Sequence, residues 1–203
     1  LEETPQLTRL KWVAVDEIPT TLADGWRPPS IQPDQLALLQ YTSGSTGKPR
    51  GHIKTFGSIY QCAKAEAERI WPIAGSPCPV LGTVPFQHMY GLESTIFLPL
   101  LGDGQLTSRL PFFPADILAS LAEMPAPCLL ITTPFHLRKL VDADITFPPI
   151  AAIVSATAPL SYELVIKAEN RLGAPVMEIY GSTETGQLAT RQTAREAEWL
   201  LYD

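Results

Sequence analysis

Short apolar runs alternate with amphipathic segments along most of this chain. The runs are rich in β-branched and large apolar side chains, and prolines, glycines or polar residues stand at their ends. Such runs are typical of buried strands. They predict strands at residues 10–15, 36–41, 79–84, 128–132, 150–154 and 176–180.

The segments between the runs are predicted to be helical. In the first of them, Ile59, Ala63 and Ala67 have the spacing of one helix face, and the polar residues Lys64 and Glu66 lie between them. Similar arguments predict helices at residues 58–70, 88–101, 116–124, 135–141 and 161–172. Strands that alternate with helices predict an α/β fold, with a mostly parallel sheet flanked by helices and organised as a single unit over residues 1–203.

Composition and charge narrow the function classes. The chain has a net charge of -6 and no basic run interleaved with aromatic residues, so nucleic acid is not expected as a partner. No apolar stretch approaches the length of a membrane span, and residues 1–6 do not resemble a secretory leader. Three cysteines without paired metal-ligand spacing favour reduced thiols and a cytoplasmic location.

Residues 41–51, Tyr-Thr-Ser-Gly-Ser-Thr-Gly-Lys-Pro-Arg-Gly, have the composition of a phosphate-binding loop. Glycines let backbone N–H groups converge, while hydroxyls and cations add hydrogen bonds and charge. A Walker A loop would need glycine at Thr42 and a hydroxyl at Pro49, and a plain polar turn is the alternative. We expect a buried strand, this loop and then a helix. The residues expected to bind phosphate are Thr42, Ser43, Gly44, Ser45, Thr46, Gly47, Lys48 and Arg50.

A second strand ends in a similar loop, Ile-Tyr-Gly-Ser-Thr-Glu-Thr-Gly at residues 179–186, which contains one carboxylate. Ligands of open α/β sheets bind beyond the carboxyl ends of the strands, so we expect the two loops to face one crevice. Taken alone, the second loop could also be a turn with a solvated glutamate.

Both loops resemble signatures of the adenylate-forming superfamily, which includes acyl-CoA synthetases, aryl-acid ligases, luciferases and the adenylation domains of peptide synthetases. Arg50 stands where that family usually has lysine, which keeps the charge and changes the geometry. The resemblance implies that Thr183 contacts the α-phosphate and that Glu184 holds Mg²⁺. It also places neighbouring residues of the second signature in the nucleotide site: Tyr180, Gly181 and Ser182.

Residues 154–161, Val-Ser-Ala-Thr-Ala-Pro-Leu-Ser, resemble the Ser-Gly-Gly-Ala-Pro-Leu segment that lines the adenine in this family. The resemblance implies nucleotide contacts for Ser155, Ala156 and Thr157. Ala156 and Thr157 replace two glycines, which leaves the backbone less free. A helix start with Ser161 as N-cap explains the same residues, and both interpretations can hold.

Residues 85–92, Pro-Phe-Gln-His-Met-Tyr-Gly-Leu, resemble the family's Pro-x-x-His-x-x-Gly motif, which implies that His88 lies beside the bound carboxylate and ATP. Without the resemblance, a histidine among apolar residues would be placed in the core. Peptide-synthetase domains carry an aspartate here for the substrate's amino group, and this segment has no acid. We therefore expect an apolar acyl or aryl substrate beside Met89, Tyr90 and Leu92.

The resemblance implies an AMP-dependent ligase that activates a fatty or aromatic carboxylic acid with MgATP. The products would be an acyl-adenylate and pyrophosphate, and the thiol of coenzyme A or of an acyl carrier protein would then displace AMP. Positioning and charge neutralisation would supply most of the catalysis.

The signatures cover residues 41–186, which correspond to the middle of a family member. The family's ribose-binding aspartate, hinge and C-terminal lid domain are not found in these 203 residues. We therefore expect an incomplete N-terminal domain that is inactive alone and prone to self-association. A non-catalytic nucleotide- or acyl-binding module and a phosphotransferase are the alternatives, and the absent Walker pattern argues against the second.

Overall fold

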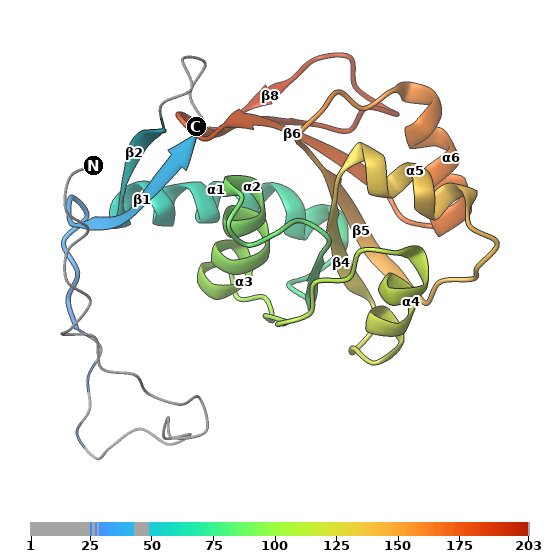
Figure 1. Cartoon of the computed structure of the whole chain (residues 1–203), viewed down its shortest axis with the longest axis horizontal. Helices are drawn as coiled ribbons and strands as arrows, with labels where there is room; N and C mark the ends of the chain where they lie inside the picture. The colour runs from blue at the N-terminus through green and yellow to red at the C-terminus, as the bar shows by residue number, and fades with distance from the viewer. Residues whose placement is uncertain (1–24, 26, 28, 43–48, 203) are drawn as a thin grey trace. The chain divides into compact units, whose positions relative to one another are not determined.

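The computed structural model describes residues 29–42 and 49–202, together with Gly25 and Arg27 (Figure 1). All elements below belong to the unit Gln32–Asp203. The strand predicted at residues 10–15 and the phosphate-loop residues 43–48 lie outside the described residues. The organisation of residues 1–203 as a single unit stays a prediction.

A six-stranded sheet with the order β3-β4-β5-β6-β7-β8 is the centre of this unit. Its first four strands are parallel and β7 and β8 extend it in antiparallel fashion, which confirms the mostly parallel α/β fold. The bounds are β3 (Val80–Gly82), β4 (Cys128–Thr132), β5 (Ile150–Ser155), β6 (Val176–Ser182), β7 (Gly186–Arg191) and β8 (Leu200–Leu201). The sequence did not predict β7 or β8, because neither forms a run of large apolar residues flanked by turns.

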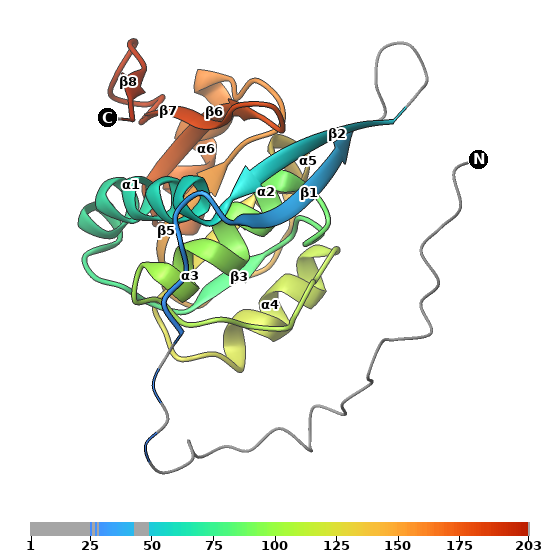
Figure 2. The same cartoon turned by 90° about the vertical axis from the view of Figure 1, so that its left-hand side faces the viewer.

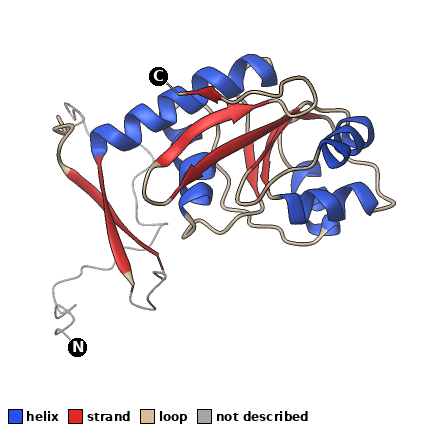
Figure 3. Ribbon diagram, turned by 90° about the horizontal axis from the view of Figure 1, so that it is seen from above, coloured by secondary structure: helices blue, strands red, loops and turns tan. Residues whose placement is uncertain are grey.

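The five predicted helices are confirmed, and the segment 88–101 consists of three consecutive short turns of helix. The bounds are α1 (Phe56–Ala74), α2 (Met89–Leu92), a π-helical turn η3 (Glu93–Phe97), α3 (Leu98–Leu101), α4 (Pro114–Ala122), α5 (Pro134–Asp142) and α6 (Tyr162–Leu172). Helices α1 to α3 cover one face of the sheet and α4 to α6 cover the other (Figures 1 and 3). None of the described helices has both the length and the apolar character needed to cross a membrane.

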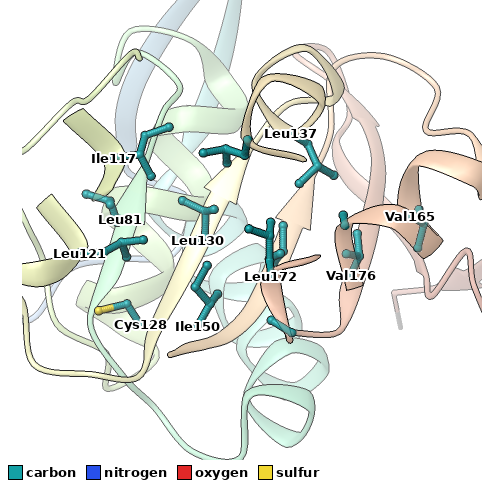
Figure 4. Packing of buried hydrophobic residues seen from close by; sticks show 14 of the residues in the cluster. Leu81, Ile117, Leu121, Cys128, Leu130, Leu137, Ile150, Val165, Leu172 and Val176 are labelled. Carbon is teal, nitrogen blue, oxygen red and sulfur yellow. The ribbon is translucent and has the colours of Figure 1, made fainter. Parts of the chain in front are cut away.

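Both faces of the parallel strands are buried, which explains why these strands read as continuous apolar runs. Leu130 of β4 packs toward α4, α5 and α6, whereas its neighbours Leu129 and Ile131 pack toward α1 and α3. Figure 4 shows the first of these two clusters, which contains Leu130 of β4 together with Ile117 of α4 and Leu137 of α5. The alternation of side chains along each strand thus fills two cores at once.

A separate two-stranded hairpin precedes α1 (Figure 2). It consists of β1 (Leu36–Thr42) and β2 (Arg50–Thr55), and Thr42 pairs with Arg50. The strand predicted at 36–41 is confirmed, but its expected burial is wrong, because Leu36 and Tyr41 are each 60% exposed. The expected order of strand, loop and helix is also wrong, since β2 intervenes. The sequence did not predict β2, because the strand has a single large apolar residue and therefore no apolar run. That residue, Ile53, faces solvent.

Candidate functional site

The predicted segments 85–92, 154–161 and 179–186 meet at the carboxyl ends of the parallel strands. The chain leaves β3 toward His88, leaves β5 into Ala156 and Thr157, and ends β6 at Ser182, just before Thr183. These five residues line one cavity of about 70 Å³, which we call the central cavity. Its other lining residues are Met89, Tyr90, Glu93, Ile179, Gly181, Gly186 and Gln187.

The loop after β6 is held by its own hydroxyls and by two glycines. The side-chain oxygens of Ser182 and Thr185 lie 3.1 Å apart, and each accepts a hydrogen bond from the other residue's backbone N–H at 3.3 Å. A Cβ at Gly181 would clash with the carbonyl oxygen of Gly186. The backbone of Gly186 has a φ of +75°. The close approach of β6 and β7 therefore requires glycine here.

Glu184, in this loop, faces the cationic side of β2. Its Oε1 lies 3.6 Å from Nε2 of His52, and Lys54 donates a hydrogen bond to its backbone carbonyl oxygen at 3.1 Å. A hydrogen bond from its own backbone amide and one from Ser182 lower the pKa of Glu184, with help from the charges of His52 and Arg50. This half-exposed carboxylate is ionised at neutral pH and offers oxygen ligands to a hard cation.

The end of the hairpin thus lies beside the loop after β6. Nε2 of His52 is 3.1 Å from Oγ1 of Thr42, so one imidazole contacts both Thr42 and Glu184. The sequence analysis missed His52 and Lys54. The signal that could have revealed them is the alternation of Arg50, His52 and Lys54, because alternate residues of a strand lie on one face. The phosphate contacts of Ser43, Gly44, Ser45, Thr46, Gly47 and Lys48 stay predictions that fall outside the described residues.

His88 is exposed and caps α2, so it is not a core histidine. Its Nδ1 accepts a hydrogen bond from the backbone N–H of Tyr90 at 3.2 Å, which leaves the ring proton of a neutral imidazole on Nε2. The buried hydroxyl of Tyr90 donates to the carbonyl oxygen of Val154 at 3.0 Å and ties α2 to β5. His88 is therefore positioned to present an N–H donor to a ligand in the central cavity.

The segment after β5 keeps a glycine-like backbone without glycine. Thr157 has a φ of +80°, in the left-handed region that a β-branched residue rarely adopts. Ser155 is fully buried, and its hydroxyl has no partner within the described part of the chain. Ser161 caps α6 as expected, with its Oγ accepting from the N–H of Leu164 at 3.3 Å. The two replaced glycines thus leave strain at Thr157.

Relief of this strain gives a first prediction. Thr157→Gly should raise the free energy of unfolding by about 1 kcal/mol, because glycine adopts a positive φ without a steric penalty. Thr157→Ala is the matched control, since alanine keeps the Cβ that causes the strain. Urea unfolding of the three proteins measures the difference. A glycine variant no more stable than the alanine variant would contradict this account.

A neighbouring cavity, which we call the aromatic cavity, lies between strand β6 and the segment that follows β5. Tyr180 is exposed there, with its ring centroid 5.6 Å from that of Trp199, and the guanidinium of Arg191 lies 4.4 Å from the Trp199 ring centroid. The buried carboxylate of Glu178 accepts hydrogen bonds from Arg191 at 2.7 Å and from the N–H of Leu160 at 3.0 Å. Sequence reasoning missed Glu178, Arg191 and Trp199, because no motif marks them.

Two buried acids lie between α1 and η3. Glu66 belongs to the polar set of the predicted helix, yet it is fully buried, because η3 and β7 cover a second side of α1. Ser94 donates to its Oε1 at 2.6 Å, while Oε2 has no partner among the described residues. Burial raises the pKa of Glu66 to about 8 and that of Glu93 to about 7.

These raised pKa values predict a stability that falls as the pH rises. Above the ordinary carboxyl value of 4.5, the folded protein binds more protons than the unfolded chain until the pH passes the raised values. Between about pH 5 and pH 7, the free energy of unfolding should therefore fall less steeply in Glu66→Gln than in the unsubstituted protein, by about 1.4 kcal/mol per pH unit. Urea unfolding across this range tests it, with Glu68→Gln, an exposed neighbour on α1, as control. Equal slopes in Glu66→Gln and the unsubstituted protein would refute it.

Comparisons with known proteins agree on one enzyme family for this chain. The model of the AMP-binding enzyme family matches residues 2–200. Indoleacetate–CoA ligase of Aromatoleum aromaticum is 29% identical over 178 residues, which are 85% of this chain and 34% of that protein. Medium-chain-fatty-acid–acyl-carrier-protein ligase JamA of Moorena producens is 37% identical over 100 residues, which are 49% of this chain and 16% of that protein.

Among solved structures, the O-succinylbenzoate coenzyme A synthetase of Bacillus subtilis in complex with AMP superposes with a TM-score of 0.68 and 28% identity. The match covers 80% of this chain and 33% of that one. The chain thus spans about a third of the length of this synthetase and of the indoleacetate ligase.

Proposed function

The chain belongs to the AMP-binding enzyme family, and from this premise we propose that it forms part of the adenylation site of an AMP-dependent acid–thiol ligase. The observation that carries the proposal is the convergence of His88, Thr157 and Thr183 on the central cavity, with the ionised Glu184 beside it. These residues come from three separate segments that resemble the family's signatures. A chance turn or a core histidine does not explain their convergence.

In the proposed reaction, an oxygen of the substrate carboxylate attacks the α-phosphorus of ATP. The bond from that phosphorus to the bridging oxygen breaks, and pyrophosphate leaves with the acyl-adenylate as the other product. The sulfur of coenzyme A or of a carrier-protein thiol then attacks the acyl carbon, AMP leaves, and the thiol proton passes to solvent. Both nucleophile and phosphate are anionic, so positioned donors and cations supply most of the catalysis.

Each of the described site residues has its own proposed role in this reaction. His88 holds the substrate carboxylate through its Nε2–H, and the hydroxyl of Thr183 contacts the α-phosphate. Arg50, at the start of β2 and close in sequence to the loop residues 43–48, neutralises the leaving phosphates. The backbone of the segment after β5 and the ring of Tyr180 flank the nucleotide base in the aromatic cavity.

Glu184 fits a magnesium ion that is shared with the substrate. The described residues contain no group of three or more His, Cys, Asp or Glu side chains able to enclose a metal. A single exposed carboxylate suits Mg²⁺, which keeps waters and takes further oxygen ligands from phosphates. When bound, the ion would neutralise phosphate charge.

The products of ATP cleavage test the proposal and separate it from its alternatives. The longest natural chain that contains residues 1–203 is incubated with a fatty or aromatic acid, a thiol acceptor and ATP labelled at the α-phosphate. We expect labelled AMP, formed through an acyl-adenylate. Labelled ADP would indicate a phosphotransferase, and tight nucleotide binding without cleavage would indicate a binding module. The inactivity of residues 1–203 alone, their self-association and the cytoplasmic location stay predictions.

A further inference from the structure

A second cavity of about 340 Å³, which we call the side cavity, adjoins the central cavity. The two share the lining residues Met89, Glu93, Gly186 and Gln187, so Glu93 stands where one leads to the other. Apolar groups of Ile59 and Met89 form part of the wall. A substrate whose carboxylate lies at His88 would extend past Glu93 into the side cavity.

The wall around Glu93 is a network of buried and half-buried polar groups. Glu93 is only 7% exposed, and its Oε1 accepts a hydrogen bond from the thiol of Cys62 at 3.5 Å. The amide of Gln187 accepts from the hydroxyl of Tyr202 at 3.0 Å and donates to Oγ of Ser94 at 3.2 Å. One wall of the side cavity is therefore polar, and its groups form hydrogen bonds mainly with one another.

Glu66 adds a second carboxyl directly behind this wall. Its Oε1 shares Ser94 with Gln187, and its buried Oε2 has no hydrogen-bond partner among the described residues. Neither Glu66 nor Glu93 forms a salt bridge within the described part of the chain. Glu93, in contrast to Glu66, lines the side cavity itself, where its carboxyl accepts a hydrogen bond only from the thiol of Cys62 among the described residues. Lys54 lines the same cavity and its charge acts on Glu93, but these two described residues form no salt bridge, so the carboxyl of Glu93 can still accept a hydrogen bond from a ligand.

We propose that the side cavity receives the tail of the carboxylic acid and that Glu93 selects a tail bearing a hydrogen-bond donor, a hydroxyl or a protonated amine. This inference rests on the proposed function, because that function places the carboxylate at His88. It adds a polar group to the apolar acyl or aryl substrate expected from residues 85–92, a segment that ends one residue before Glu93. The preferred substrates are hydroxy- or amino-substituted fatty or aromatic acids.

Matched acids test the proposal on the longest natural chain that contains residues 1–203. Carboxylate-dependent ATP–pyrophosphate exchange is measured with octanoate, 8-hydroxyoctanoate and 8-aminooctanoate, and with benzoate and its 4-hydroxy and 4-amino derivatives. At least one substituted acid should exceed its parent in kcat/KM by about tenfold, and the favoured series shows which donor the site takes. Glu93→Leu should bring that ratio close to one. Glu93→Gln, which keeps an acceptor oxygen, should retain a preference for hydroxyl but not for amine.

Each outcome decides between the two claims. Exchange in which the parent acids match or exceed the substituted ones would overturn this inference and leave the proposed function standing. Exchange with none of these acids, in a folded chain, would contradict both. Glu68→Gln, which changes an exposed carboxylate of α1 outside the side cavity, is the control and should leave the ratio unchanged. The comparison of substituted with parent acids in the unsubstituted protein needs no variant. It therefore remains decisive even if Glu93→Leu fails to fold.

Discussion

Glu184→Gln should lower the rate of adenylation about a hundredfold while leaving the fold intact. Glutamine keeps the shape of the side chain and removes the charge that we propose for Mg²⁺ binding. The fold should tolerate the change, because the side chain is 55% exposed and the loop is held by other bonds. Ser182 and Thr185 bond to each other, and Lys54 bonds to the backbone carbonyl of Glu184.

The dependence on Mg²⁺ distinguishes this role from a general loss of structure. The variant should need a higher Mg²⁺ concentration for half-maximal rate, and excess Mg²⁺ should restore part of the activity. Glu123→Gln is the matched control, because it removes an exposed carboxylate paired with Arg109, outside the site. A Glu184→Gln enzyme with the unsubstituted rate at limiting Mg²⁺ would exclude Glu184 as a metal ligand.

Arg191→Ala should destabilise the protein by about 3 to 5 kcal/mol, because it leaves the carboxylate of Glu178 buried without its charge partner. Glu178 is 3% exposed and accepts two hydrogen bonds from Arg191, at 2.7 and 3.2 Å. Its remaining donors are the hydroxyl of Thr193 and the N–H of Leu160. Those two donors cannot replace a full positive charge.

A second ion pair nearby provides the comparison. Arg195→Ala removes an arginine whose side chain is 52% exposed and which pairs with Glu169, so it should cost less than about 1 kcal/mol. Arg191→Ala should also weaken nucleotide binding, because the Glu178 carboxylate anchors the segment at Leu160 that borders the aromatic cavity. Urea unfolding and AMP titration measure the two effects. Similar losses of stability in both variants would contradict the assignment of a buried pair.

The sequence could predict the central sheet and its helices for a simple physical reason. Strands covered by helices on both faces must be apolar along their whole length, so β4 and β5 stand out in the sequence without any knowledge of their partners. The same reasoning failed for β2, where Ile53 is exposed. It also failed for Glu66, because helical periodicity shows which residues share a face but not how many neighbours will cover the helix.

The site was partly predictable from local motifs. His88, Thr157 and Thr183 belong to segments that resemble signatures of the family, and the parallel topology places the ends of those segments together. His52, Arg191 and Glu93 could not be assigned in the same way. The significance of His52 comes from its contact with Glu184, far away in the sequence, and that of Arg191 from its pairing with Glu178 across β6 and β7. The significance of Glu93 comes from a cavity that only the fold creates.

The central claim is that these residues form the adenylation site of an AMP-dependent ligase, and carboxylate-dependent ATP–pyrophosphate exchange tests it most directly. The assay uses the longest natural chain containing residues 1–203 with a panel of plain, hydroxylated and amino-substituted fatty and aromatic acids. The account predicts exchange that requires both Mg²⁺ and an acid and is lost about a hundredfold in Glu184→Gln. A folded chain that binds ATP yet catalyses no exchange with any acid would contradict it.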